Sequence, residues 1–232
     1  MKPIRSIAIV LPVLWFAWVL PLPSAASMPA PPDTARLRAV LRYVAPDRAD
    51  PVQLLLRRED DRLVLRDGGA IVASRSLDQV AAVSIGGPDR TDTELTVDYS
   101  GGDIAQPIDF HPGALGPSTV NALTLAGGSA TTMSHRAAGP HDGVIERDGA
   151  IIRYANLTPL TDTAPSITVT FSVPATAFVI NIVDGPAGTT QINDGGTAKF
   201  ESYSFANKQT VVINAAPTGR RSPSPIRHRR PA

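Results

Sequence analysis

Residues 83–109 read VSIGGPDRTDTELTVDYSGGDIAQPID, and short segments within them alternate between apolar and polar residues. Ile85, Leu95 and Val97 occupy the apolar positions, whereas polar residues such as Glu94 occupy the positions between them. Successive side chains of a β-strand point to opposite faces of a sheet, so this period of two predicts strands with one buried face. Gly-Gly turns separate these strands and mark where the chain changes direction.

The same alternation continues on both sides of this stretch. Runs rich in Val, Ile, Thr and Leu are bounded by Gly, Pro, Asn or Asp, which is typical of short strands joined by turns. The fold class is therefore predicted to be all-β. The further predicted strands are Val52–Arg57, Arg62–Arg66, Ala70–Ser74, Pro107–Phe110, Val120–Leu125, Ala130–His135, Val144–Arg147, Ala150–Tyr154, Ile167–Val173, Phe178–Val183, Thr189–Ile192, Ala198–Phe205 and Gln209–Ile213.

Strands at this spacing fit three architectures: a β-sandwich, a β-barrel or a β-solenoid. Gly-Gly corners after short strands favour a β-solenoid, resembling a parallel β-helix with hairpin excursions, because a coil must turn sharply several times in each rung. The β-sandwich is the alternative, since the segments around Arg57–Arg62 and Arg147–Ala150 have the character of antiparallel hairpins.

The first 26 residues have the three parts of a secretory signal peptide. Lys2 and Arg5 form a basic end, Ile7–Leu20 is an apolar run, and small residues precede a cleavage position after Ala26. A membrane anchor is the alternative, but the run is shorter than the roughly 20 apolar residues that span a bilayer. We therefore expect a secreted or cell-surface protein with no stable membrane span after cleavage.

Residues 27–51 form a Pro- and Ala-rich lead with one predicted helix. Asp33 or Thr34 can cap it, and Leu37, Val40 and Leu41 recur at helical spacing. Residues 52–215 form the predicted β domain.

Composition excludes some function classes. The 232 residues contain no cysteine, so neither disulfides nor a thiol nucleophile are available. Seven of the 22 basic residues lie in residues 1–26 and 220–232, which contain no acidic residue. The body between them therefore has 15 basic and 21 acidic residues and a net negative charge. An acidic body argues against nucleic acid as a partner, because that binding needs clustered Lys and Arg.

The turn at residues 86–92, GGPDRTD, is the one candidate metal site. It is reminiscent of the Gly-Gly-x-Gly-x-Asp turn of hemolysin-type repeats, in which carbonyl and carboxylate oxygens bind calcium. Asp89 and Asp92 are the candidate calcium ligands. The third glycine is missing, Arg90 adds a cation, and a turn stabilised by Asp side chains is the alternative.

No convergent catalytic set is predicted. Asp33-Thr-Ala and Asp162-Thr-Ala resemble paired aspartic-protease signatures but lack the Gly at the third position. His135, with His141 and Asp142, is the nearest approach to a metal-binding pair, spread over a loop. Catalytic residues and cofactors are therefore predicted to be none, with calcium as the only candidate ion.

Three segments resemble a repeat unit of very large secreted bacterial surface proteins, in which strand-rich units alternate with hemolysin-type calcium-binding repeats. They are Val83–Asp103, Gly143–Asp162 and Thr210–Ala215. Leu157–Asp162 matches the family's Leu-x-Pro-apolar-x-Asp signature, with Thr158 in place of the usual acidic residue. The resemblance implies a surface location and a structural role.

We expect a secreted structural or adhesive cell-surface module without enzymatic activity, whose partners are a cell-surface polymer or other surface proteins. The alternative is a carbohydrate-active β-helix enzyme of the polysaccharide lyase or hydrolase type, although Lys199 and Lys208 are the only lysines after the signal. Residues 216–232 are rich in Arg, Pro and Ser and predict a disordered basic tail. Its composition is also typical of a shifted reading frame, so a truncated fragment of a larger repeat protein is a further hypothesis.

Overall fold

The computed structural model describes residues 38–177 and 179–215, which form strands joined by turns and two short 3-10 helices. The all-β prediction is confirmed. In chain order the elements are β1 (Ala39–Val44), β2 (Val52–Glu59), β3 (Arg62–Asp67), β4 (Ala70–Ser76), η1 (Leu77–Gln79), β5 (Val80–Gly86), β6 (Thr93–Asp98), β7 (Ile108–His111), β8 (Asn121–Ala126), β9 (Ala130–Ala137), β10 (Gly143–Arg147), β11 (Ala150–Tyr154), β12 (Leu160–Asp162), β13 (Ser166–Ser172), β14 (Asn181–Asp184), η2 (Pro186–Gly188), β15 (Thr190–Asn193), β16 (Tyr203–Phe205) and β17 (Lys208–Asn214).

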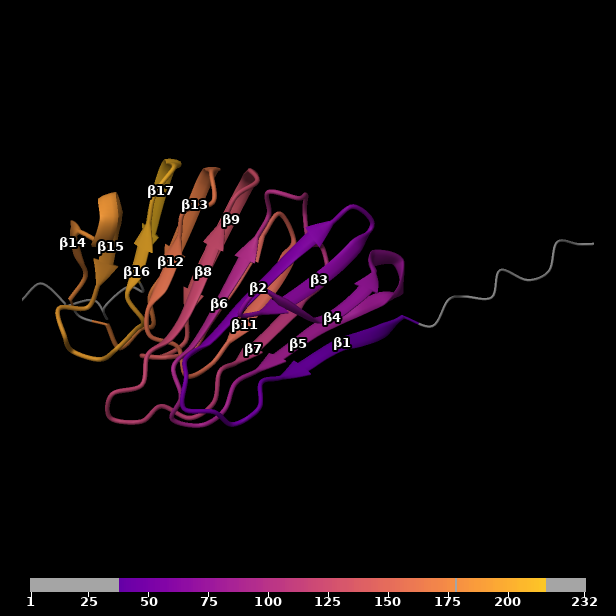
Figure 1. The fold of residues 1–232 in the computed structure, drawn as a ribbon. Helices are drawn as coiled ribbons and strands as arrows, with labels where there is room; N and C mark the ends of the chain where they lie inside the picture. The colour runs from indigo at the N-terminus through magenta and orange to yellow at the C-terminus, as the bar shows by residue number, and fades with distance from the viewer. Residues whose placement is uncertain (1–37, 178, 216–232) are drawn as a thin grey trace, which may run out of the picture. The chain divides into compact units, whose positions relative to one another are not determined.

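The strands form two large mixed sheets, which line a common core (Figure 1). The first sheet has the order β1-β5-β7-β11-β10-β9-β13-β17, and the second has the order β14-β15-β16-β12-β8-β6-β2-β3-β4. The described chain alternates between the two sheets, and apart from the antiparallel excursions its colour in Figure 1 runs from indigo at one end of the sheets toward orange and yellow at the other. Three antiparallel excursions, β2-β3-β4, β9-β10-β11 and β14-β15-β16, interrupt otherwise parallel pairing.

The parallel strands pair in register, so equivalent inward residues form columns. In the second sheet one column is Leu54, Leu95, Leu123, Leu160 and Tyr203, one residue from each successive strand. All five are buried. Because a slip of one residue would turn each apolar side chain to solvent, these columns fix the register of the whole sheet.

The central stretch behaves as its alternation predicts. Ile85, Leu95 and Val97 are buried, whereas Glu94 is exposed. The first two strands of this stretch, β5 and β6, lie in different sheets, so the Gly-Gly-Pro-Asp turn between them carries the chain from one sheet to the other.

The predicted helix in residues 27–51 is wrong where the structure describes it. Val40 and Leu41 lie in β1, which pairs in parallel with β5. Leu41 is buried and Val40 is exposed, the alternation of a strand, so pairing with a sheet edge overrides the helical spacing of the sequence. The strand predicted over Ala198–Phe205 is also shorter, because only Tyr203–Phe205 pairs.

Several predictions fall outside the described residues. These are the signal peptide at 1–26, the helix cap at Asp33 and the tail at 216–232. The described part of the chain contains no helix that is long and apolar enough to cross a membrane.

Replacing Leu95 tests whether the inward columns stabilise the fold. Leu95 is 0% exposed and lies on β6, between β2 and β8. Leu95→Ala is expected to lower the free energy of unfolding by about 2–5 kcal/mol, because it leaves a cavity in a packed column. Glu94→Ala, on the outer face of the same strand, is the control and should change it by less than about 0.5 kcal/mol. Urea titration of both variants measures the difference, and equal losses would contradict the assignment of the two faces.

Candidate functional site

The predicted calcium turn, which joins β5 to β6, is held to the turn that joins β7 to β8. Asp89 Oδ1 accepts a hydrogen bond of 2.7 Å from the backbone N–H of Ala114, and Asp92 Oδ1 accepts one of 2.8 Å from that of Val120. The backbone N–H of Arg90 donates to the carbonyl of Ala114 over 3.0 Å. Each carboxylate therefore stabilises a neighbouring turn.

Within residues 38–177 and 179–215, no group of three or more His, Asp or Glu side chains is placed to hold a metal ion. Asp89 and Asp92 each use one oxygen on a backbone amide of another turn. The prediction of calcium at these two residues therefore rests on the turn sequence alone.

The histidines singled out in the sequence are not brought together. His135 is buried, and its Nε2 lies 2.6 Å from the hydroxyl of Tyr154. His141 is half-exposed, with Nδ1 3.0 Å from the carbonyl oxygen of Leu157. Burial lowers the pKa of His135 to about 3, so its ring is neutral and packs as a core residue.

The second residue of the protease-like pair, Asp162, lies in the interior between the two sheets. Its column in the second sheet is Leu56, Val97, Leu125, Asp162 and Phe205, so a carboxylate replaces an apolar side chain. This arrangement does not resemble a solvent-facing catalytic dyad.

The Asp162 carboxylate accepts three hydrogen bonds. Its Oδ1 accepts from Lys208 Nζ over 2.8 Å and from the backbone N–H of Ala164 over 3.1 Å, and its Oδ2 accepts from the Tyr203 hydroxyl over 2.7 Å. Lys208 Nζ also donates to the carbonyl of Ala164. The side chains of Asp162 and Lys208 are each 1% exposed, so the pair is sealed from water.

The surroundings of this pair are dry and aromatic. The ring of Tyr203 stacks on that of Phe171 with centroids 5.4 Å apart, and the ring of His135 lies 5.1 Å from that of Tyr203. The cavity beside Asp162, which Leu125 and Tyr203 help to line, is too small to admit a water molecule. A charge at this point therefore has little solvent to stabilise it.

Burial shifts both ionisable groups toward their neutral forms. Desolvation raises the pKa of Asp162 against the opposing effect of Lys208 and Tyr203. Desolvation likewise lowers the pKa of Lys208, against the attraction of Asp162 and with help from the positive charge of Arg147. The two shifts agree in direction, because in each case the charged form is the one that burial disfavours.

A second polar site lies on the surface, at the end of β2. A hollow of about 530 Å³ is lined by Arg57, Arg58, Glu59, Asp60, Ser100 and Gly101. It combines guanidinium, carboxylate and hydroxyl groups, which are the groups that protein surfaces use to bind carbohydrates and anionic polymers.

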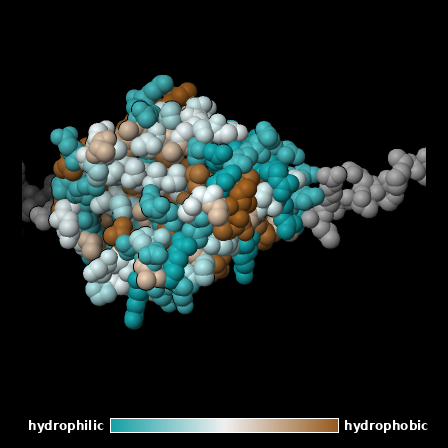
Figure 2. Space-filling model, viewed as in Figure 1, coloured by the Kyte–Doolittle hydropathy of each residue, from teal (hydrophilic) through white to brown (hydrophobic). Residues whose placement is uncertain are grey.

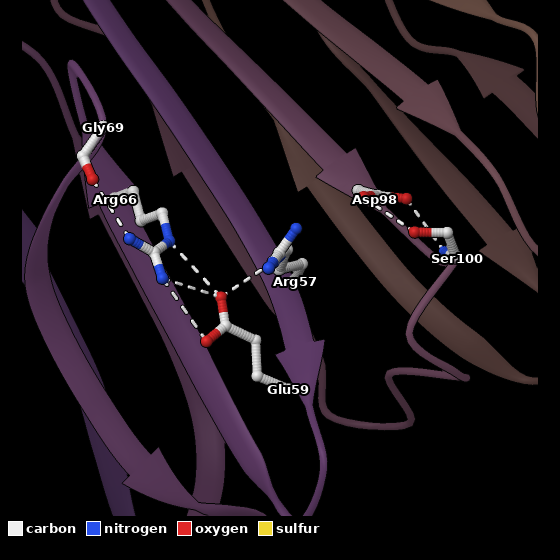
Figure 3. A network of polar contacts seen from close by, with 6 residues as sticks. All are labelled: Arg57, Glu59, Arg66, Gly69, Asp98 and Ser100. Atoms are coloured by element: carbon white, nitrogen blue, oxygen red, sulfur yellow. Dashed lines mark hydrogen bonds and ion pairs between the residues drawn. The ribbon is translucent and has the colours of Figure 1, made fainter.

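Glu59 organises one wall of this surface site (Figure 3). Its carboxylate accepts from Arg57 Nε over 2.8 Å and from Arg66 Nη2 over 3.0 Å, and Arg66 Nη1 donates to the carbonyl of Gly69. These hydrogen bonds lower the pKa of Glu59, so it stays ionised near neutral pH. Arg57 is 40% exposed, so part of its guanidinium faces solvent.

The sequence reasoning missed both sites. Asp162 and Lys208 are 46 positions apart and lie in different sheets, so no local spacing joins them. A signal was nevertheless present, because Asp162 follows Leu160 at the inward period of two, where an apolar residue is expected. Arg57, Glu59 and Arg66 come together only because β2 and β3 pair as a hairpin.

The buried carboxyl group of Glu201 is expected to make the stability of the fold depend on pH. It is buried, and desolvation raises its pKa to about 8 from an ordinary 4.5. The unfolded chain loses this proton above about pH 4.5 while the folded chain keeps it, so stability falls as the pH rises from there to about 8. Glu201→Gln is expected to remove this fall and to be more stable than the wild type at pH 8, by an amount on the order of a few kcal/mol.

Urea unfolding of wild type and Glu201→Gln between pH 4 and 9 measures this effect. Glu146→Gln, at an exposed position of β10, is the control and should keep the wild-type dependence. A wild-type profile that is flat between pH 4.5 and 8 would contradict a buried protonated Glu201.

The comparisons with known proteins supply no family. No family model matches the chain, and neither the comparison with curated proteins nor the comparison with solved structures finds a match. The function is therefore argued from the geometry of the two sheets and their sites.

Proposed function

We propose that the chain is a secreted structural or adhesive cell-surface module, built as a β-solenoid with hairpin excursions. The observation that supports the coil is that the described chain alternates between the two sheets. Within each sheet, consecutive strands such as β5 and β7, or β6 and β8, pair in parallel and in register. One strand from each sheet then forms one rung of the solenoid, and each rung buries its apolar residues against those of the next rung.

The outer faces support a role in contact with other molecules. Thr96, Thr124 and Thr161 pair in register along the second sheet, and Thr132, Thr168 and Thr210 do so along the first. Figure 2 shows one face covered mainly by hydrophilic and intermediate residues, with hydrophobic residues in separate patches. Regular rows of hydroxyl groups on a flat surface suit repeated hydrogen bonding to an extended polymer.

We assign the surface hollow beside β2 as the contact point for an acidic cell-surface polysaccharide. Arg57 and Arg58 line it together with Ser100. A guanidinium binds a carboxylate through two parallel hydrogen bonds, which gives both affinity and orientation.

The alternative is a carbohydrate-active enzyme of the lyase or hydrolase type, and the hydrolase needs a protonated carboxylic acid near the scissile bond. In the hollow, Arg57 and Arg66 hold the pKa of Glu59 below its ordinary value, so Glu59 is a poor proton donor at neutral pH. The described carboxyl groups with raised pKa values, Asp162 and Glu201, are buried away from this surface. The hollow therefore favours binding over cleavage.

Binding is tested by titrating the purified chain with polygalacturonate in low-salt buffer by calorimetry. The double variant Arg57→Gln with Arg58→Gln is expected to bind at least about tenfold more weakly, because hydrogen bonds to charged groups contribute roughly 1.5–3 kcal/mol each. Arg136→Gln with Arg153→Gln, on the other sheet, removes the same charge and should leave the affinity within about twofold. Equal losses in the two double variants, or no binding by the wild type, would contradict the assigned contact point.

Location is tested by separating the culture medium, the outer surface and the cytosol of the producing cells. The chain is expected in the medium or on the surface, with Met1–Ala26 removed, because that segment has the three parts of a secretory signal. Mass spectrometry of the N-terminus shows whether cleavage has occurred. Recovery in the cytosol with Met1–Ala26 attached would overturn the secretion proposal.

A further inference from the structure

Asp162 and Lys208 join the two sheets at a point sealed from solvent. Asp162 ends β12 in the second sheet, and Lys208 begins β17 in the first. Their Nζ and Oδ1 atoms are 2.8 Å apart, and each side chain is 1% exposed. A lasting link between these two residues would fasten one sheet to the other across the core.

An ordinary buried ion pair is a poor explanation for this arrangement. Taking a carboxylate and an ammonium out of water costs several kcal/mol per ion, which their attraction only partly offsets. Leu125 and Phe205 flank Asp162 in its column, and Met133 Sδ lies 4.0 Å from Lys208 Nζ. These neighbours supply no further charge to stabilise the ions.

We propose that Asp162 and Lys208 are the site of a self-generated isopeptide bond that staples β12 to β17. The Lys208 amine attacks Cγ of the Asp162 carboxylic acid, a new C–N bond forms, and one C–O bond breaks. The leaving oxygen departs as water, which carries the acid proton and one amine proton. The product is a secondary amide, and the step needs no oxidant, reductant or further reactant.

The contacts around Asp162 suit this condensation. The amine must be uncharged to attack and the acid must be protonated to lose water, and burial favours both of these forms. Arg147, the second cation near Lys208, further disfavours the charged amine because it lowers the pKa of Lys208. Proximity and fixed orientation replace the activation that a free acid and amine would need in water.

Tyr203 is assigned as the positioning residue. Its hydroxyl donates to Oδ2 over 2.7 Å, while the amine lies against Oδ1. Oδ2 is therefore the oxygen retained in the amide, and the phenol stabilises the negative charge that develops on it during attack. The backbone N–H of Ala164 donates to Oδ1 and holds the carboxyl group in place.

The bond is tested by tryptic digestion and mass spectrometry of the full purified chain. Trypsin cuts after Lys and Arg, and the sequence places Asp162 in peptide 154–199 and Lys208 at the end of peptide 200–208. An amide at Lys208 blocks cleavage there. The expected product is one branched species that joins residues 154–199 to residues 200–220. Its mass equals that of an uncut linear peptide 154–220, so fragmentation or Edman degradation must show two N-termini, Tyr154 and Phe200.

Three variants make the result specific. Lys208→Arg keeps a cation but cannot form this amide, so the branched species should be lost. Asp162→Asn should give the same branched species with loss of ammonia in place of water, since its amide can undergo the same attack. Tyr203→Phe keeps the ring, and the fraction of linked chain should fall by at least about tenfold at early times after synthesis, the size expected for removing one oxyanion donor.

Two outcomes would overturn the proposal. One is recovery of separate peptides 200–208 and 209–220 from the wild type, with Lys208 cleaved normally. The other is a peptide 154–208 lighter by one water molecule that persists in Lys208→Arg, because Lys199 would then carry the link as a loop within that peptide.

Discussion

The in-register stacking of inward side chains is the constraint on which the rest of the structure depends. Leu54, Leu95, Leu123 and Leu160 lie one above another on successive strands of the second sheet, and each is buried. Every turn between sheets has to return the chain to this register. The Asp89 and Asp92 carboxylates, which accept hydrogen bonds from the backbone of the turn between β7 and β8, help to achieve that return.

Much of the fold could be predicted from the sequence, because the alternation of apolar and polar residues is local. Ile85, Leu95 and Val97 are buried as their spacing indicates. β12 was missed as a strand because it has only three residues, Leu-Thr-Asp, and its aspartate breaks the apolar pattern. β1 was misread as a helix because its partner, β5, begins at Val80, far along the chain.

The sites were harder to predict than the strands. Parallel pairing joins residues that are distant in sequence, so the meeting of Asp162 with Lys208 depends on the register of whole sheets. The surface hollow likewise requires that the β2–β3 hairpin and the turn at Ser100–Gly101 lie side by side. The turn sequence gave the calcium prediction for Asp89 and Asp92, which stays a prediction, and the structure adds that each carboxylate accepts a hydrogen bond from a backbone amide.

The two sheets end differently toward the C-terminal side of the described chain. There the second sheet ends in the antiparallel strands β15 and β14, whereas the first ends in β17, which pairs only with β13 in the described residues and exposes Val211 and Val212. Unpaired backbone groups on a flat apolar edge recruit strands from other molecules. β17 is therefore one edge at which a strand of another molecule can add, as is β14, where Ile182 and Val183 are exposed. A charged residue in place of Val211 would protect the β17 edge when the protein is handled at high concentration.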